Sequence, residues 1–388
     1  MTEKKVVISP KKRKIYPFVI ILLVTLIMAS VIELTSILIL KSKNKNVFPF
    51  LISLGKKEKI IDKRTRMYNY LDPHLGYSHN NTIMRKKNPN YLLDGFALYK
   101  NSDSRSVKTE KTVKIITLGG STTDCVHRHN WPKQLCDVFK EKGISCEIYN
   151  GGIAGYSSNQ ELLKMIRVCL PLKPDIIICM NGVNEVGTSH SVKNHPMVET
   201  YQQQIFQHIV TSAVRPSPIF PNTIALLKSM IIKEPEVIKG INWGLGVNTT
   251  PWDQWKRNII IMNAVTKAFN MEYFCFLQPI LGVGDYVPTP GEKEMLKKKG
   301  KGYLKTVKDF YDKARPISKA FSFCIDIAGI FDETTGMYKG PRHPNKEGYH
   351  IIAEVVFKEL EERSSIIKNL LQNKKQGTSA ANGKKRKK

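Results

Sequence analysis

The sequence has few acidic residues, but the resulting positive charge does not by itself indicate a nucleic-acid partner. Its 388 residues include 33 Asp and Glu against 61 Lys and Arg, a formal net charge of +28. Much of the excess lies in flanking runs: KKRK, KSKNK, GKKEK and the terminal NKKQGTSAANGKKRKK. Such runs are attracted to anionic lipid head groups or remain solvated tails. Because zinc-finger spacing and aromatic RNA-binding motifs are missing, we expect no nucleic-acid partner.

Paired cysteines and cofactor motifs are also lacking. The seven cysteines are an odd number, and Cys179, Cys275 and Cys324 lie inside apolar, strand-like runs. Buried free thiols behave as small hydrophobic residues, so we expect no disulfide framework. No two cysteines have metal-ligand spacing, and neither GxxxxGK[ST] nor GxGxxG follows the first strand-like run. The sequence therefore implies no metal and no cofactor.

One apolar run is much longer than the others. Residues 16–40, YPFVIILLVTLIMASVIELTSILIL, are interrupted only by Glu33 and a few small hydroxyl residues. A helix needs roughly 20 apolar residues to cross a bilayer, whereas the core of a signal peptide has about 7–15. We predict an uncleaved transmembrane helix, with a cleaved signal or a buried core helix as alternatives. Glu33 is tolerable near a helix end or in an oligomer interface.

Basic residues flank this run on both sides, so the positive-inside rule gives nearly a tie. The denser cluster abuts the start of the helix and favours a cytoplasmic N-terminus. We therefore predict a single-pass membrane protein whose main domain is extracytoplasmic, held to the membrane by the helix and its basic flanks.

Composition also predicts the organisation of the chain. Turn-forming pairs such as Asp72-Pro73 mark a segment ahead of the main domain, and scattered prolines mark an insertion within it. The predicted parts are a basic tail (1–15), the membrane helix (16–40), a basic stalk (41–66), an N-terminal extension packed on the domain (67–110), the main domain (111–373) with an insertion at about 186–250, and a basic disordered tail (374–388).

Strand-like and helix-like segments alternate from residue 111 onward. VKIITLG, CEIYNGG, PDIIICMNG, EYFCFLQP and FCIDIAGIF have the length and apolar content of strands. Helical apolar spacing occurs between them, as in WPKQLCDVFKEKG and SSNQELLKMIRVCL. This alternation predicts an α/β domain, doubly wound and flavodoxin-like, with a mainly parallel sheet between two layers of helices.

Polar residues follow several of these strands, at the edge where open α/β sheets bind ligands. GGST contains Ser121, NGGIAGYS follows the second strand, NGVNE contains Asn184, and GPRHPNKEG contains His343. A nucleophile, an imidazole base and donors for an oxyanion are the groups that acyl transfer needs. Two other readings of GGSTT are a simple turn and an anion cradle at a helix N-terminus. Asn150 and Asn181 are expected to buttress their loops.

These four segments resemble, in order, the conserved blocks of the SGNH (GDSL-type) hydrolase superfamily. The resemblance spans roughly residues 111–360. It implies that Ser121 is the nucleophile and that its backbone N–H is one oxyanion donor. It further implies that Gly155 and the Asn184 side chain are the other donors, with two earlier glycines of the second block as competitors for Gly155. His343 resembles the family's catalytic base.

Two positions depart from the family pattern. Gly120 stands where the first block usually has Asp, which leaves the nucleophile and its backbone donor intact. Gly340 stands three residues before His343, where the family carries the Asp that orients the imidazole. Asp332 is our candidate for that role, with Glu333 second, because both lie on the loop that leads to His343.

The resemblance implies a serine esterase that hydrolyses an O-acyl ester, acetyl foremost, without a cofactor. DPHLGY, the Trp-Pro pair after the nucleophile and FLQP look like a membrane-linked subgroup associated with acylated cell-envelope glycans. We therefore expect an acylated carbohydrate or envelope lipid as substrate. An O-acyltransferase acting on surface polysaccharide with the same residues, and a catalytically inactive glycan-binding module, are the alternatives. The sequence indicates no oligomeric state.

Overall fold

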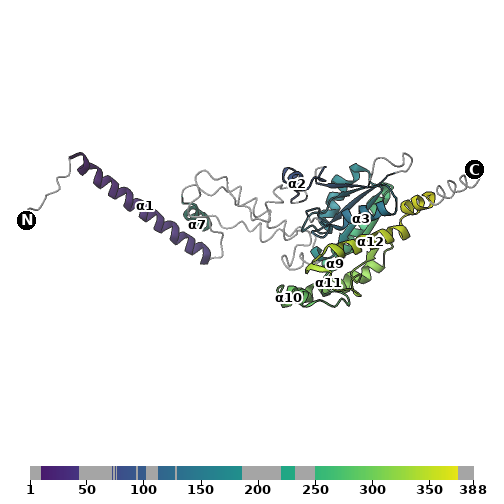
Figure 1. The fold of residues 1–388 in the computed structure, drawn as a ribbon. Helices are drawn as coiled ribbons and strands as arrows, with labels where there is room; N and C mark the ends of the chain where they lie inside the picture. The colour runs from purple at the N-terminus through teal and green to yellow at the C-terminus, as the bar shows by residue number, and fades with distance from the viewer. Residues whose placement is uncertain are drawn as a thin grey trace, which may run out of the picture. The chain divides into compact units, whose positions relative to one another are not determined.

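The structure, a computed structural model, describes residues 10–42, 72, 75, 77–92, 95–101, 112–126, 129–185, 220–231 and 250–374 (Figure 1). Contacts divide the chain into a smaller unit, Met1–Ile61 with Phe206–Gly246, and a larger unit, Asp62–Ile205 with Val247–Lys388. Nearly all of the predicted stalk, most of the predicted insertion and residues 375–388 lie outside the described residues.

The larger unit is built on a six-stranded sheet. Its strands are β1 (Ala97–Lys100), β2 (Val113–Gly119), β3 (Cys146–Asn150), β4 (Ile176–Asn181), β5 (Glu272–Leu277) and β6 (Cys324–Asp326). Their order is β1-β3-β2-β4-β5-β6, with β2 to β6 parallel and β1 antiparallel to β3 at one edge. Without β1 this is the flavodoxin-like order, so the predicted fold class is confirmed.

Helices cover both faces of this sheet. They are α2 (Asn81–Lys87), α3 (Trp131–Glu141), α4 (Ser158–Lys164), the π-helical and 3-10 turns η2 (Met165–Cys169) and η3 (Leu170–Leu172), α9 (Pro251–Ala268), α10 (Pro290–Lys297), α11 (Lys301–Lys319) and α12 (Lys346–Arg363). One buried cluster joins the sheet to α3 and α12, and a second joins its other face to α9 and α11. The three-layer arrangement therefore follows from two separate hydrophobic cores.

The central strand β4 shows why a continuous apolar run predicted a buried parallel strand. All six of its residues are buried, because helices cover both faces of a parallel sheet at this point. Cys179 within it and Cys275 in β5 are fully buried and pack as hydrophobic residues. All seven cysteines are buried free thiols, as predicted.

Several elements were not predicted. The edge strand β1 is one, and a short hairpin of β7 (Tyr338–Gly340) and β8 (His343–Pro344) is another. Residues 365–374 are helical, so the predicted disordered tail is wrong at its first residue: Lys374 ends this helix and donates to the carbonyl oxygen of Lys142 at 2.6 Å.

The smaller unit contains two described helices, α1 (Pro10–Ser42) and α7 (Pro221–Ile231), which pack together (Figure 1). Within α1, residues Tyr16–Ser42 form a helix long and apolar enough to cross a membrane, and almost none of its most apolar window is buried by protein. The described part of the predicted insertion is α7, and it belongs to the same compact unit as α1.

Candidate active site

Ser121 lies in a tight turn directly after β2. The strand ends at Gly119, and the backbone N–H groups of Thr123 and Asp124 both donate to the carbonyl oxygen of Gly120, at 3.0 and 3.1 Å. Thr123 and Asp124 are buried, whereas Ser121 is half-buried. The turn therefore presents the serine hydroxyl at the carboxyl edge of the sheet.

His343 meets Ser121 from a distant part of the chain. It begins β8 and pairs with Gly340 of β7 across the hairpin. Its Nε2 lies 2.7 Å from Oγ of Ser121, 222 positions earlier in the sequence. Sequence analysis predicted this pair from motif order alone, and the structure places the two side chains in hydrogen-bond contact.

Neighbouring contacts hold the loop that carries His343 against the turn that carries Ser121. The hydroxyl of Thr122 donates to the carbonyl oxygen of Arg342 at 3.4 Å, which links the residues next to each member of the pair. The side chain of Asn345 accepts from the N–H of Gly348 at 2.9 Å and caps α12. Both ends of the segment that carries the imidazole are thus fixed.

Asn184 lies directly against the turn that carries Ser121. Its Nδ2 donates to the carbonyl oxygen of Tyr156 at 2.7 Å. A Cβ on Gly120 would lie 2.1 Å from that Nδ2 and 3.1 Å from the Tyr156 oxygen. Three segments of the site therefore meet at Gly120, and a side chain there would displace the Asn184 amide.

The second loop contributes Gly155, which has a φ of +88° in the region that favours glycine. Gly151 and Gly152, the competing oxyanion donors, already donate their N–H groups to Thr117 O at 2.8 Å and Asn150 Oδ1 at 2.9 Å. These bonds favour Gly155 as the donor. Asn150 is a loop buttress, as expected.

Asn181 also plays a structural part. Its Nδ2 donates to Oε2 of Glu161 at 2.7 Å, and its Oδ1 accepts from the thiol of Cys275 at 3.2 Å. All three side chains are buried. These contacts agree with the expectation that Asn181 buttresses its loop.

Asp332 and Glu333, the residues predicted to orient His343, make no hydrogen bond to its ring that the structure shows among the described residues. Oδ1 and Oδ2 of Asp332 lie 2.7 Å from the positions that Cβ atoms would occupy on Gly284 and Gly329, respectively. Its Oδ1 is buried without a hydrogen-bond partner among the described residues, so it does not contact the imidazole. Glu333 is exposed.

Gly340 lies beside the imidazole of His343. A Cβ on Gly340 would lie 3.8 Å from Nδ1 of His343, and no other atom of the described residues, its two chain neighbours aside, would lie within 4 Å of it. A side chain at position 340 would therefore point toward the ring nitrogen that faces away from Ser121.

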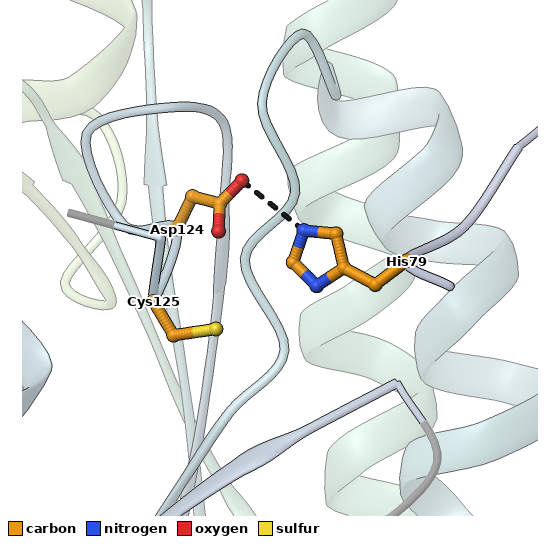
Figure 2. A group of neighbouring side chains, drawn as sticks. All are labelled: His79, Asp124 and Cys125. Carbon is orange, nitrogen blue, oxygen red and sulfur yellow. Dashed lines mark hydrogen bonds and ion pairs between the residues drawn. The ribbon is translucent and has the colours of Figure 1, made fainter. Parts of the chain in front are cut away.

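A buried carboxylate that sequence analysis missed links the first two blocks. Asp124 accepts from the N–H groups of Ala154 at 2.8 Å and Val126 at 2.9 Å, and from Nε2 of His79 at 3.2 Å (Figure 2). Burial alone would raise the pKa of Asp124, but the charge of His79 and these hydrogen bonds outweigh it and lower that pKa. Because Ala154 precedes Gly155, Asp124 positions the loop that carries the candidate donor.

The same three-residue cluster has metal-ligand chemistry. His79, Asp124 and Cys125 each offer one ligand atom, and these atoms lie within 4.8 Å of one another (Figure 2). However, the oxygens of Asp124 already accept three hydrogen bonds, and burial raises the pKa of the Cys125 thiol, which disfavours the thiolate that binds metals. The contacts fit a hydrogen-bonded structural cluster better than a metal centre.

Lys164 is a second buried charge near the site that sequence analysis missed. Its Nζ donates to the carbonyl oxygens of Gly151 at 2.7 Å and Gly95 at 3.1 Å, and it lies 4.6 Å from the ring centre of Phe96. Burial lowers the pKa of Lys164 to about 8. The lysine joins the second block to the N-terminal extension. In the sequence, only its position inside the helical stretch SSNQELLKMIRVCL hinted at burial.

Comparisons with known proteins find similar solved structures but no matching sequence. No family model and no curated protein matches the sequence. Similar solved structures include an acetyl xylan esterase, AlAXEase (14% identity, TM-score 0.38, 63% of this chain and 98% of that chain). A catalytic mutant of the acetylxylan esterase Axe2 from Geobacillus stearothermophilus matches at 12% identity and TM-score 0.40, over 66% and 96% of the two chains. A GDSL-like lipase from Bacteroides thetaiotaomicron matches at 16% and 0.35, over 64% and 88%.

Proposed function

We propose that this protein is a serine esterase of SGNH type that cleaves an O-acyl ester through an acyl-enzyme intermediate. The observation that carries the proposal is the 2.7 Å contact between Oγ of Ser121 and Nε2 of His343. That distance suits proton transfer from a hydroxyl to a base, the first requirement of nucleophilic catalysis by serine.

In the proposed mechanism, Nε2 of His343 takes the proton of Ser121 as Oγ attacks the ester carbonyl carbon. The tetrahedral oxyanion accepts hydrogen bonds from the N–H groups of Ser121 and Gly155 and from Nδ2 of Asn184. Tyr156 O holds one amide hydrogen of Asn184, and in this mechanism the other amide hydrogen binds the oxyanion. The imidazolium then protonates the leaving alcohol, and water, deprotonated by His343, releases the acid and restores the serine.

The group that orients the imidazole is the part of the mechanism that departs from the family. Asp332 stays our proposal for this role only through Oδ2, since Oδ1 makes no hydrogen bond among the described residues and so does not hold the ring. A serine–histidine pair also functions without an orienting carboxylate when another acceptor holds the ring.

The proposed substrate is an acylated carbohydrate or envelope lipid, with acetyl as the acyl group. The proposed setting is a membrane, with α1 as a single-pass anchor and the larger unit outside the cytoplasm. The length and apolar composition of Tyr16–Ser42 support the anchor. An O-acyltransferase would use the same residues with a sugar hydroxyl in place of water.

The test is hydrolysis of p-nitrophenyl acetate by the full chain in detergent, wild type against Ser121→Ala and His343→Ala. We expect both substitutions to abolish turnover and Ser121→Ala to abolish labelling by a fluorophosphonate probe. If wild type and Ser121→Ala were equally inert toward esters and probe, the inactive-module alternative would replace the enzyme. Acyl transfer to an added acceptor sugar, without a matching release of acid, would favour the transferase.

A further inference from the structure

Glu33, the one charged residue inside the apolar run of α1, is buried by α7. Its Oε1 accepts from the backbone N–H and the side-chain Nδ2 of Asn222, both at 2.7 Å. Its Oε2 accepts from the N–H of Thr223 at 2.9 Å and from its Oγ1 at 2.7 Å. Glu33 is 2% exposed, and the hydroxyl of Ser36, one turn later, lies 3.2 Å from that of Thr223. The first turn of α7 therefore surrounds the carboxylate.

The position of Glu33 within the span makes these contacts informative. At 1.5 Å per residue, it lies roughly 14 Å before the end of Tyr16–Ser42, well inside a hydrocarbon core about 30 Å thick centred on that segment. A lone carboxylate is costly there, and so is a helix N-terminus with unsatisfied N–H groups. Here each satisfies the other, and the negative charge lies at the positive end of the α7 dipole.

Exposed apolar side chains lie on and next to α7, whose sequence has a single charged residue, Lys228. Leu227 and Met230, three residues apart on one face, are 50% and 68% exposed, and Phe220 just before the helix is 40% exposed. The helix has 11 residues and is therefore roughly 16 Å long, about half the thickness of the core. That length is too short to cross a bilayer and suits a segment that enters and leaves on one side.

We propose that α7 is a membrane-embedded half-helix, fixed to α1 through Glu33 and covered on its outer face by lipid acyl chains. The inference rests on the proposed membrane anchor and adds a second contact with the bilayer from the middle of the chain. It also requires that α1 is retained in the mature protein, because cleavage after an apolar signal would remove Glu33 from α7.

A cysteine-pair experiment tests the packing of α7 on α1. In the full chain in native membranes, Ser36→Cys with Thr223→Cys should form an intramolecular disulfide under mild oxidation, since their hydroxyl oxygens lie 3.2 Å apart. The matched control is Thr35→Cys with Thr223→Cys, because Thr35 is exposed and bonds only its own helix, at Val31 O. The seven native thiols are buried, and the unsubstituted chain corrects for any reaction they give. Equal crosslinking of both pairs, or of neither, would overturn the packing.

An environment-sensitive dye tests the lipid contact. Attached to Met230→Cys, the dye should show blue-shifted emission and lose intensity to quenchers on lipid acyl chains; attached to Val287→Cys, an equally exposed apolar position (67%) in the larger unit, it should do neither. Water-like emission at 230 would overturn the proposal, and so would disulfide-linked dimers through position 230, which indicate a second copy instead of lipid. Extraction of the whole chain by alkaline carbonate would refute the anchor itself. Retention of the chain with an unquenched dye at 230 would refute only the embedding of α7.

Discussion

Gly340→Asp should convert the serine–histidine pair into a triad. The hairpin already points position 340 at the imidazole, since a Cβ there would lie 3.8 Å from Nδ1 of His343 with no other atom in contact. Gly340 does not have a positive φ, so the backbone accepts a side chain without strain. The new carboxylate would lie one bond beyond that Cβ, close enough to approach the hydrogen-bonding distance of about 2.7–2.9 Å.

The size of the gain follows from that one contact. A hydrogen bond to a charged group contributes about 1.5–3 kcal/mol, and this carboxylate binds the imidazolium that forms in the transition state. At about 1.36 kcal/mol per tenfold in rate, kcat/KM for p-nitrophenyl acetate should rise about 10- to 100-fold. The acidic limb of the pH–rate profile should move upward by about one unit, because a neighbouring carboxylate favours the protonated ring.

Gly340→Asn is the matched control, because it adds nearly the same volume without the charge. The assay is initial-rate hydrolysis by wild type and both variants across pH 5–9, with thermal unfolding to confirm that each is folded. A folded Gly340→Asp variant no faster than Gly340→Asn would refute the reasoning. It would mean that the group already holding His343 is as effective as a carboxylate.

Three further substitutions test the supports of the site. Gly120→Ala should lower kcat about 10²- to 10³-fold, the effect of losing one oxyanion donor, because its Cβ would lie 2.1 Å from Nδ2 of Asn184; an unchanged kcat would exclude that donor. Asp124→Asn should cost about 3–5 kcal/mol in urea unfolding at pH 7 by breaking a buried pair. Since its folded pKa is below the ordinary 3.8, this difference should persist above that pH and shrink as pH falls through the lower folded value. For Lys164→Met, the free energy of unfolding of the wild type minus that of the variant should be constant below pH 8. Between pH 8 and 10.5 this difference should rise by about 1.4 kcal/mol per pH unit, because the folded lysine loses its proton before the unfolded one. A difference that does not change with pH would refute its burial as a charge.

The parts of the fold that could be predicted are those whose signal is local. The strand β4 is buried at every position, and a continuous apolar run records this directly. The edge strand β1 was missed because its four residues, ALYK, resemble any short apolar stretch, and its pairing with β3 depends on distant residues. The β7–β8 hairpin is too short to carry a periodic pattern.

The site residues also fall into those that local sequence patterns predict and those that depend on distant partners. Ser121 and His343 follow or begin regular elements at the carboxyl edge of the sheet, and the topology of a doubly wound fold brings such positions together. The supporting charges could not be placed in this way, because their partners come from loops whose approach is set by packing. Asp124 reads as one more polar residue of a turn until His79 is found against it.

Glu33 illustrates the same limit in the apolar helix α1. In the sequence, Glu33 is a charged residue inside an apolar helix. Such a residue is tolerated near a helix end or against a partner in an oligomer. The structure shows a third arrangement within the chain, in which the carboxylate accepts hydrogen bonds from N–H groups of a helix about 190 positions later. A carboxylate and a helix N-terminus are each unfavourable in hydrocarbon, and they become compatible with it only as a pair. Neither segment alone records the other, so this pairing requires coordinates, and it explains why Glu33 interrupts a run that is otherwise suited to lipid.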